Sequence, residues 1–247
     1  MSATKTTILL LLSVVFLFGS TASVLAQRKF SRSFPAGTAV RLQLTNRSGT
    51  VTVVGWNRPE VNIVAMLEAP AANIVPKQDD GVIDLDLVRD NQGRDEVGNV
   101  NFTIRVPYNL TISIETRMGN LSVTSLSGNF LRAHISTEGD IELTNITSAN
   151  VAADTITGDI FYDGDIQSGG IYRFTAVKGN INIRIPFSSS FKFQATAPST
   201  RDISMGPFAD ASMNSLGTGR RLVGKFRDGA ATLTVTNQRG SIKFLPR

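Results

Sequence analysis

Gly139-Asp140-Ile141-Glu142-Leu143 is one copy of a five-residue phrase: a glycine, a small polar residue, and two apolar residues that flank one further residue. The other regular copies are Gly119-Asn120-Leu121-Ser122-Val123, Gly158-Asp159-Ile160-Phe161-Tyr162 and Gly179-Asn180-Ile181-Asn182-Ile183. Weaker copies are Gly49-Thr50-Val51-Thr52-Val53 and Gly240-Ser241-Ile242-Lys243-Phe244. The glycines of the four regular copies are 20, 19 and 21 residues apart, and such a period is typical of stacked repeats.

Apolar and polar residues alternate along almost all of the chain beyond residue 26, which is the pattern of half-buried β-strands. No segment shows a helical period. Short strands in units of roughly 20 residues predict an all-β, parallel β-helix-like solenoid, with Ile141, Ile160 and Ile181 side by side on one inner face. A β-sandwich is the alternative, because alternation alone does not distinguish the two architectures.

A second set of apolar residues follows the glycine phrases with the same period. Leu131, Val151, Tyr172 and Phe191 are 20, 21 and 19 residues apart. Equivalent positions of successive coils lie above one another in a stacked repeat. We therefore expect these four side chains to form one column inside the protein.

The glycines that begin the phrase are predicted to form sharp corners, where a positive φ or a close backbone neighbour excludes a Cβ atom. The Asn or Asp that follows each of them suits the same corner, because its side chain can bond nearby backbone groups. The predicted structural turn glycines are Gly49, Gly119, Gly139, Gly158, Gly179 and Gly240.

Residues 1–26 have the pattern of a signal peptide: a positive charge at Lys5, an apolar segment over residues 8–18, and Val24-Leu25-Ala26 as a small-residue cleavage site. The apolar segment is too short to span a bilayer of about 30 Å. We expect an exported protein, located in the periplasm, at the cell surface or outside the cell, with no transmembrane segment after cleavage.

Residues 27–247 are predicted to form a single β-solenoid domain. Within it, residues 27–118 are expected to contain irregular early coils or a cap, because Pro-containing and charged loops interrupt the strands there. Residues 119–247 are expected to contain the regular coils and the C-terminal closure. Arg201 occupies the place of the next glycine, so the register is expected to break near it.

The composition excludes several chemistries. The chain has no cysteine, which removes disulfides, thiolate metal sites, cysteine nucleophiles and the attachment point of a bacterial lipid anchor. The formal net charge is +5 and falls by one without residues 1–26, since these contain Lys5 and no acid. This modest excess favours an anionic partner, and export argues against nucleic acid.

The glycine phrases resemble those of the exported bacterial "putative adhesin" family, a domain of unknown function. The opening Asn46-Arg47-Ser48-Gly49-Thr50-Val51-Thr52-Val53-Val54-Gly55-Trp56 and the closing Phe226-Arg227-Asp228-Gly229-Ala230-Ala231-Thr232-Leu233 carry the same resemblance, which covers most of residues 38–245. It implies a β-helix-like, adhesin-like domain at the cell envelope. It brings no catalytic residues, and Arg201 departs from its pattern.

Candidate catalytic residues are few, and none forms a recognisable set. His134, the single histidine, alternates with inward residues and is therefore expected on the outer face. The chain has no Gly-x-Ser-x-Gly motif that would supply a serine nucleophile for it. Asp140 with Asp159, or Glu138 with Glu142, could approach across adjacent coils and act as the carboxylates of a glycan-active enzyme. Asp140 and Asp159 also suit a corner. We predict no catalytic residues and no enzyme activity.

Two binding motifs are weak. Asp159, Asp163 and Asp165 could converge on calcium but lack the spacing of known calcium loops. The segment Gly219-Arg220-Arg221-Leu222-Val223-Gly224-Lys225 has the spacing of a phosphate-binding loop, yet Phe226 stands where the Mg²⁺-binding Ser or Thr is needed. We therefore predict no metal and no cofactor.

The densest positive cluster adjoins a Gly-rich loop that breaks the coil register. It predicts a binding surface for an anionic glycan or an envelope surface, formed by Arg220, Arg221, Lys225 and Arg227. The expected function is that of a non-enzymatic, adhesin-like binding or structural protein. The alternatives are a glycan-active β-helix enzyme and an envelope accessory protein that acts through an unknown protein partner.

Overall fold

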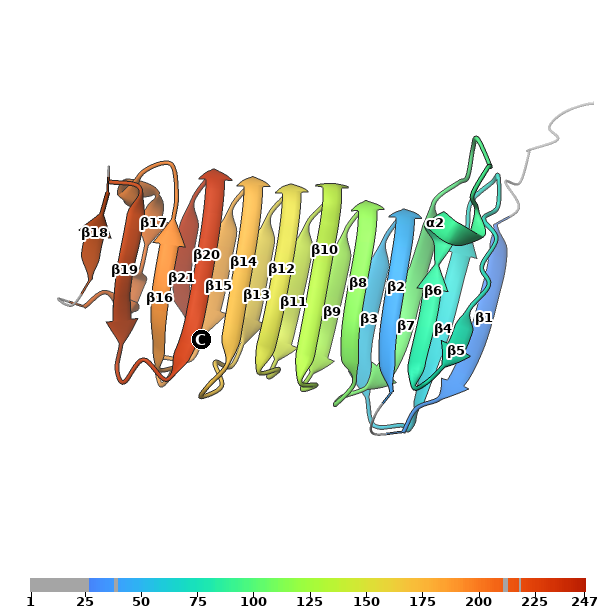
Figure 1. Cartoon of the computed structure of the whole chain (residues 1–247), viewed down its shortest axis with the longest axis horizontal. Coiled ribbons are helices and arrows are strands. Elements are labelled where there is room, and N and C mark those ends of the chain that lie inside the picture. Colours follow the sequence, from blue (N-terminus) through green and yellow to red (C-terminus); the bar gives the residue numbers. More distant parts are fainter. Residues whose placement is uncertain (1–26, 38–39, 211–212, 218) are drawn as a thin grey trace, which may run out of the picture.

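The computed structural model describes residues 27–37, 40–210, 213–217 and 219–247. The predicted signal peptide, residues 1–26, lies outside the described residues. Most of the described residues lie in strands and the helical segments are short, so the all-β prediction is confirmed. Its strands form two open sheets, of ten and eleven strands, that face each other along the length of the molecule (Figure 1).

The bounds of the elements follow the order in which strands are hydrogen-bonded. The ten-stranded sheet contains β1 (Arg28–Pro35), β4 (Glu60–Leu67), β7 (Val100–Pro107), β3 (Val51–Trp56), β9 (Leu121–Leu126), β11 (Ile141–Ile146), β13 (Ile160–Gly164), β15 (Ile181–Ile185), β21 (Ile242–Pro246) and β17 (Ile203–Ser204). The eleven-stranded sheet contains β18 (Asn214–Leu216), β19 (Arg221–Phe226), β16 (Phe191–Thr196), β20 (Ala231–Arg239), β14 (Ile171–Lys178), β12 (Asn150–Thr157), β10 (Phe130–Glu138), β8 (Thr111–Met118), β2 (Arg41–Ser48), β6 (Val82–Asp86) and β5 (Lys77–Asp79). Short helical turns are α2 (Leu87–Asp90), η2 (Thr200–Asp202) and η3 (Gly206–Phe208).

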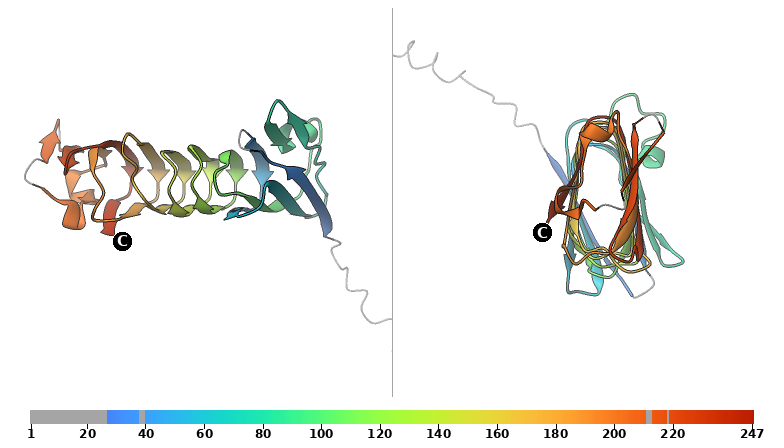
Figure 2. Two further views of the ribbon diagram at one scale, coloured as in Figure 1. Left: turned by 90° about the horizontal axis from the view of Figure 1, so that it is seen from below. Right: turned by 90° about the vertical axis from the view of Figure 1, so that its left-hand side faces the viewer.

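The central strands pair in parallel, each with the equivalent strand of the next repeat. Ile141 is the register partner of Ile160, and Ile160 is the partner of Ile181. Each glycine phrase starts a strand of the ten-stranded sheet, and the segment before it lies in the other sheet (Figure 2). The sheets of immunoglobulin-type β-sandwiches are antiparallel. Here antiparallel pairs are confined to the two ends of the sheets.

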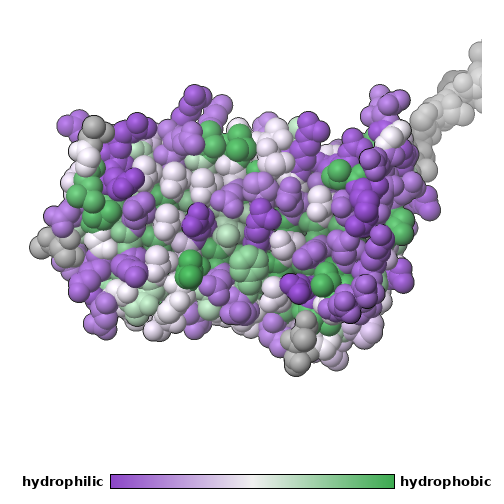
Figure 3. All heavy atoms as spheres, viewed as in Figure 1, coloured by the Kyte–Doolittle hydropathy of each residue, from purple (hydrophilic) through white to green (hydrophobic). Residues whose placement is uncertain are grey.

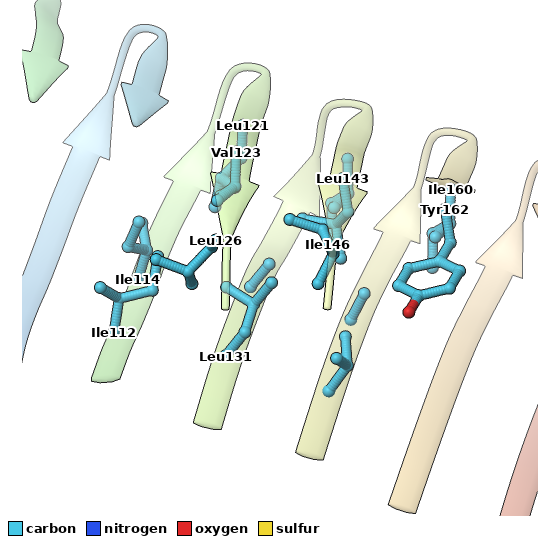
Figure 4. Close-up of a cluster of buried hydrophobic side chains, with 14 of the residues drawn as sticks. Ile112, Ile114, Leu121, Val123, Leu126, Leu131, Leu143, Ile146, Ile160 and Tyr162 are labelled. Carbon is cyan, nitrogen blue, oxygen red and sulfur yellow. The ribbon is translucent and has the colours of Figure 1, made fainter. Parts of the chain in front are cut away.

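The core is the space between the two sheets, and inward side chains from both sheets fill it (Figure 4). Ile112 and Ile114 of β8 and Leu121 and Val123 of β9 are among the side chains in this space, and all four are buried. Fully burying such a side chain contributes about 1.5–3 kcal/mol. The core continues without interruption from Phe34 near one end to Phe244 near the other.

The N-terminal end is less regular than the centre. There β4 pairs antiparallel with β1 on one side and with β7 on the other, while β5 and β6 form an antiparallel pair in the facing sheet. By contrast, β2 and β3 pair in parallel with β8 and β9 of the regular repeats.

The expected column of four apolar residues is wrong at its last member. Leu131, Val151 and Tyr172 are register partners in turn, but the partner of Tyr172 is Leu233, and Leu233 in turn pairs with Phe193. The cause is that β20 is inserted between β14 and β16, so the C-terminal repeat separates strands that are neighbours in the chain. In the other sheet β21 is likewise inserted between β15 and β17.

Within the described ranges, no helix combines the length and the apolar composition needed to span a bilayer.

Candidate functional site

The six predicted turn glycines form a column along one edge where the sheets meet. Their φ angles lie between +108° and +151°, a range that favours glycine. A Cβ atom on any of the last five would overlap the carbonyl oxygen of the preceding corner glycine. Arg201, expected in place of a further glycine, lies in η2, where the chain leaves the corner geometry.

The polar residues after these glycines bond one another's backbone. The Asp159 amide donates to Asp140 Oδ1 at 2.8 Å, and the Asn180 amide donates to Asp159 Oδ1 at 2.7 Å. In the same way, the Asp140 amide donates to Asn120 Oδ1 at 3.0 Å, and the Ser241 amide donates to Asn180 Oδ1 at 3.2 Å. The two carboxylates considered for catalysis are therefore used to hold adjacent corners together.

The other catalytic candidates are dispersed. His134 lies on the outward face between Glu115 of β8 and Asp154 of β12, and its buried Nδ1 atom has no hydrogen-bond partner in the described part of the chain. Glu142 lies between Ser122 and Phe161 on the other sheet. In the described strands, no hydroxyl group is a register partner of His134, and no second carboxylate is a register partner of Glu142.

Two of the three aspartates considered for calcium, Asp163 and Asp165, are paired with arginines. Asp163 is only 3% exposed, and its carboxylate lies 2.6 Å from Arg184 Nη2 and 3.2 Å from Arg247 Nε. Arg247 also contacts Asp165 at 3.0 Å. The hydrogen bond to Asp163 raises the pKa of Arg184. Among the described residues, no group of three or more side chains is placed to hold a metal ion.

The segment with phosphate-loop spacing forms strand β19 and not a loop before a helix. On this strand Arg221 and Lys225 share the outward face, about 13 Å apart. Strand β16 places Lys192 directly beside Lys225 and Thr196 beside Arg221. The structure therefore brings two of the predicted binding residues to one face and adds Lys192 to them.

The other two predicted binding residues lie at the ends of β19. Arg220 precedes the strand and lines, with Leu216 and Arg221, a surface hollow of about 500 Å³. Arg227 follows the strand with φ +57°, and its guanidinium lies 5.6 Å from the Phe187 ring centroid and 5.8 Å from that of Phe226. The exposed Arg227 side chain thus lies next to two aromatic rings, beyond the end of the strand that carries Arg221 and Lys225.

The outward face around these residues has an uneven charge distribution. Across the neighbouring strands β14, β20, β16, β19 and β18 no outward residue is acidic, whereas Arg173, Lys192, Arg221 and Lys225 are basic. Between them lie the hydroxyl groups of Thr175, Thr196, Thr232, Thr234 and Thr236. We call these nine residues the basic threonine face; Figure 3 shows the side of the molecule that bears it.

Such a face can bind an extended anion, with cations for its charges and hydroxyl groups for its polar atoms. The sequence alone did not group Lys192 and Arg173 with Lys225, because they lie 33 and 52 residues before it. Only the order of the strands in the sheet brings them together. The local sequence indicated only that both side chains point outward, because each precedes a phenylalanine, Phe193 or Phe174, that is buried.

Comparison with known proteins gives a family and a fold. A family model described as "Toastrack DUF4097" matches residues 33–244. Similar solved structures include a "putative cell adhesion protein" from Clostridium sporogenes ATCC 15579, with 10% identity, a TM-score of 0.50 and coverage of 90% of this chain and 100% of that one. Another is a "putative adhesin" from Bacteroides fragilis NCTC 9343, with 11% identity, a TM-score of 0.49 and coverage of 90% and 99%. No curated protein matches.

Proposed function

The chain belongs to the Toastrack DUF4097 family, and from this premise we propose that it is a non-enzymatic binding protein of the cell envelope that recognises an anionic glycan through the basic threonine face. The observation that carries the proposal is that four outward cations lie on β14, β16 and β19, within a group of five neighbouring strands that has no outward acidic residue. The similar structure from Clostridium sporogenes, a "putative cell adhesion protein", agrees with a binding role.

The architecture proposed for this role is a β-solenoid formed by residues 27–247 as one domain. The parallel pairing of equivalent strands and the uninterrupted core support it. In such a stack, outward residues of successive strands are about 4.8 Å apart, so cations and hydroxyl groups form rows that match a linear polymer. Residues 27–118 form irregular early coils or a cap in this architecture.

A non-enzymatic role is supported by the contacts that the candidate carboxylates make within the protein. Asp140 and Asp159 accept backbone amides, and Asp163 is paired with arginines. A general acid or base needs a carboxyl group that is free to exchange a proton with substrate.

Export to the envelope is part of the same proposal. The signal-peptide pattern of residues 1–26 supports it. N-terminal sequencing of the protein from an extracellular or periplasmic fraction should begin at Gln27.

The test compares two variants with the same change in charge. In the first, Lys192, Arg221 and Lys225 are changed to Ser; in the control, the exposed residues Lys29, Lys77 and Arg117, which lie off this face, are changed to Ser. Exposed ion pairs contribute about 0.2–1 kcal/mol each, so the first variant should lose roughly 3- to 100-fold in affinity for an acidic polysaccharide at low salt.

Binding by the unchanged protein should also weaken as ionic strength rises. Equal losses in the two variants would show that net charge and not this face is responsible. Absence of binding to acidic polysaccharides and to whole cells at low salt would favour a purely structural role.

A further inference from the structure

A second surface hollow, of about 460 Å³, lies at the other end of the molecule from the basic threonine face. Its walls are the end of β3 with the turn that follows, residues 56–59, the end of β7 with the turn that follows, residues 107–109, and residues 36–37 after β1. Two aromatic side chains, Trp56 and Tyr108, line it together with Arg58 and two asparagines, Asn57 and Asn109.

The two aromatic side chains are held by specific contacts. Trp56 Nε1 donates a hydrogen bond to the Glu60 carbonyl at 2.9 Å, which fixes the indole ring. The Tyr108 ring lies against Gly55, where an added Cβ atom would be 2.8 Å from Tyr108 Cδ1. Since the tyrosine side chain is nonetheless 45% exposed, part of its ring is available to a ligand.

The charge at this hollow is positive. The Arg58 guanidinium lies 5.0 Å from the Trp56 ring centroid, and that of Arg105 lies 5.9 Å from it, so both cations are oriented by the ring. The nearest acidic partner is Glu60, whose carboxylate is 3.8 Å from Arg58 Nη1, and both side chains of that pair are solvent-exposed. No ion pair of Arg105 occurs in the described part of the chain.

We propose that this hollow binds the ring of an acidic sugar, with the pyranose lying on Tyr108 and its carboxylate at Arg58. An aromatic face carries negative partial charge and attracts the weakly positive C–H groups on one side of a pyranose. Asn57 and Asn109 each offer both a donor and an acceptor, as sugar hydroxyl groups require.

The shape of the hollow supports a sugar over an apolar ligand. Asn57, Arg58, Tyr108 and Asn109 are all exposed, so the hollow is open to water. A pocket for an apolar molecule covers about 70–90% of the ligand surface, which an open hollow cannot do. A sugar that lies flat on one ring needs to bury only one side.

This inference deepens the proposed function, because it names a sugar-ring site in addition to a charged face, but the two sites can be tested apart. Trp56 is the single tryptophan of the chain, so tryptophan fluorescence reports on this hollow alone. The probes are a trimer of galacturonic acid and the corresponding neutral trimer of galactose.

The galacturonate trimer should change Trp56 emission in a saturable way and reduce its quenching by acrylamide. Tyr108→Ala and Arg58→Gln should each weaken this binding about tenfold, and the galactose trimer should bind the unchanged protein about tenfold more weakly than the acidic one. The triple Ser variant of Lys192, Arg221 and Lys225 serves as the matched control and should retain the full fluorescence response.

Three results would overturn the inference. One is no saturable change in fluorescence up to about 10 mM trimer, where even a millimolar Kd would be visible. Another is an unchanged affinity in both pocket variants with native circular dichroism. The third is equal binding of the neutral and acidic trimers, which would remove the role of Arg58. If the control variant loses polymer binding but keeps the fluorescence response, the two sites are independent.

Discussion

Replacing Gly158 by Ala should destabilise the protein severely, because this residue is both conformationally restricted and closely packed. Its φ is +141°, a value that L-residues rarely adopt. The added Cβ atom would overlap the Gly139 carbonyl oxygen and lie 2.6 Å from its carbon, whereas real Cβ atoms essentially never approach other atoms within 3.0 Å. The added Cβ atom would also lie 3.0 Å from Asp140 Oδ1, which accepts the Asp159 amide. A shift of the corner would therefore also disturb the hydrogen bond between Asp159 and Asp140.

Two contributions set the magnitude of the loss. Holding a non-glycine residue in this region costs about 1–3 kcal/mol. Forcing a methyl group into a packed site costs about 1–3 kcal/mol more. The free energy of unfolding should therefore fall by about 2–6 kcal/mol, a large part of the 5–15 kcal/mol of a typical domain.

Gly93→Ala is the matched control. Gly93 has a φ of +78°, but an added Cβ atom there has nothing within 4 Å. Its cost should be conformational strain alone, about 1–2 kcal/mol. Urea unfolding followed by circular dichroism measures both variants. If the two free energies of unfolding agree within about 0.5 kcal/mol, the close stacking of corners is not what excludes a side chain from Gly158.

Two further predictions concern buried or stacked polar groups. Asp159→Ala removes the acceptor of the Asn180 amide and should cost about 1 kcal/mol, whereas Asp159→Asn, which keeps an oxygen, should cost clearly less in urea unfolding; equal costs would contradict the corner bond. Burial raises the pKa of Tyr162 well above 10.0, so the unfolded chain loses this proton first and stability should decline as pH rises above about 10. Thermal unfolding of Tyr162→Phe should show a shallower decline, although Tyr172, whose pKa burial also raises, still contributes; an unchanged slope would refute the assignment.

The repeats were predictable because glycine spacing and alternation are local properties of the chain. Alternation decides which face a side chain takes, and the glycine that begins each phrase marks a corner that no other residue fits. Ile141, Ile160 and Ile181 accordingly are register partners.

The order of strands at the C-terminal end was not predictable in the same way. Phe191 follows Tyr172 at the expected spacing, yet Leu233 is the actual neighbour of Tyr172. Local spacing determines the length of a repeat but not which repeat lies beside it, and here β20, not β16, pairs with β14.

The candidate binding residues illustrate the same limit. Arg221 and Lys225 were found because they are close in sequence, and Arg227 was grouped with them for that reason although its side chain packs on Phe187 and Phe226. Lys192 could be found only through the antiparallel pairing of β16 with β19. The aromatic hollow likewise joins turns at residues 56–59 and 107–109 that no local pattern connects.

The position of β20 between β14 and β16 constrains the order in which the chain can fold during its synthesis. A ribosome completes residues 191–196 well before residues 231–239, so a nascent chain presents the open edge of β14 to β16 while its final neighbour does not yet exist. Any pairing formed then has to be undone before the last repeat can enter. A chain that is kept unfolded until synthesis ends, as chains exported through a narrow translocation channel are, avoids this conflict altogether.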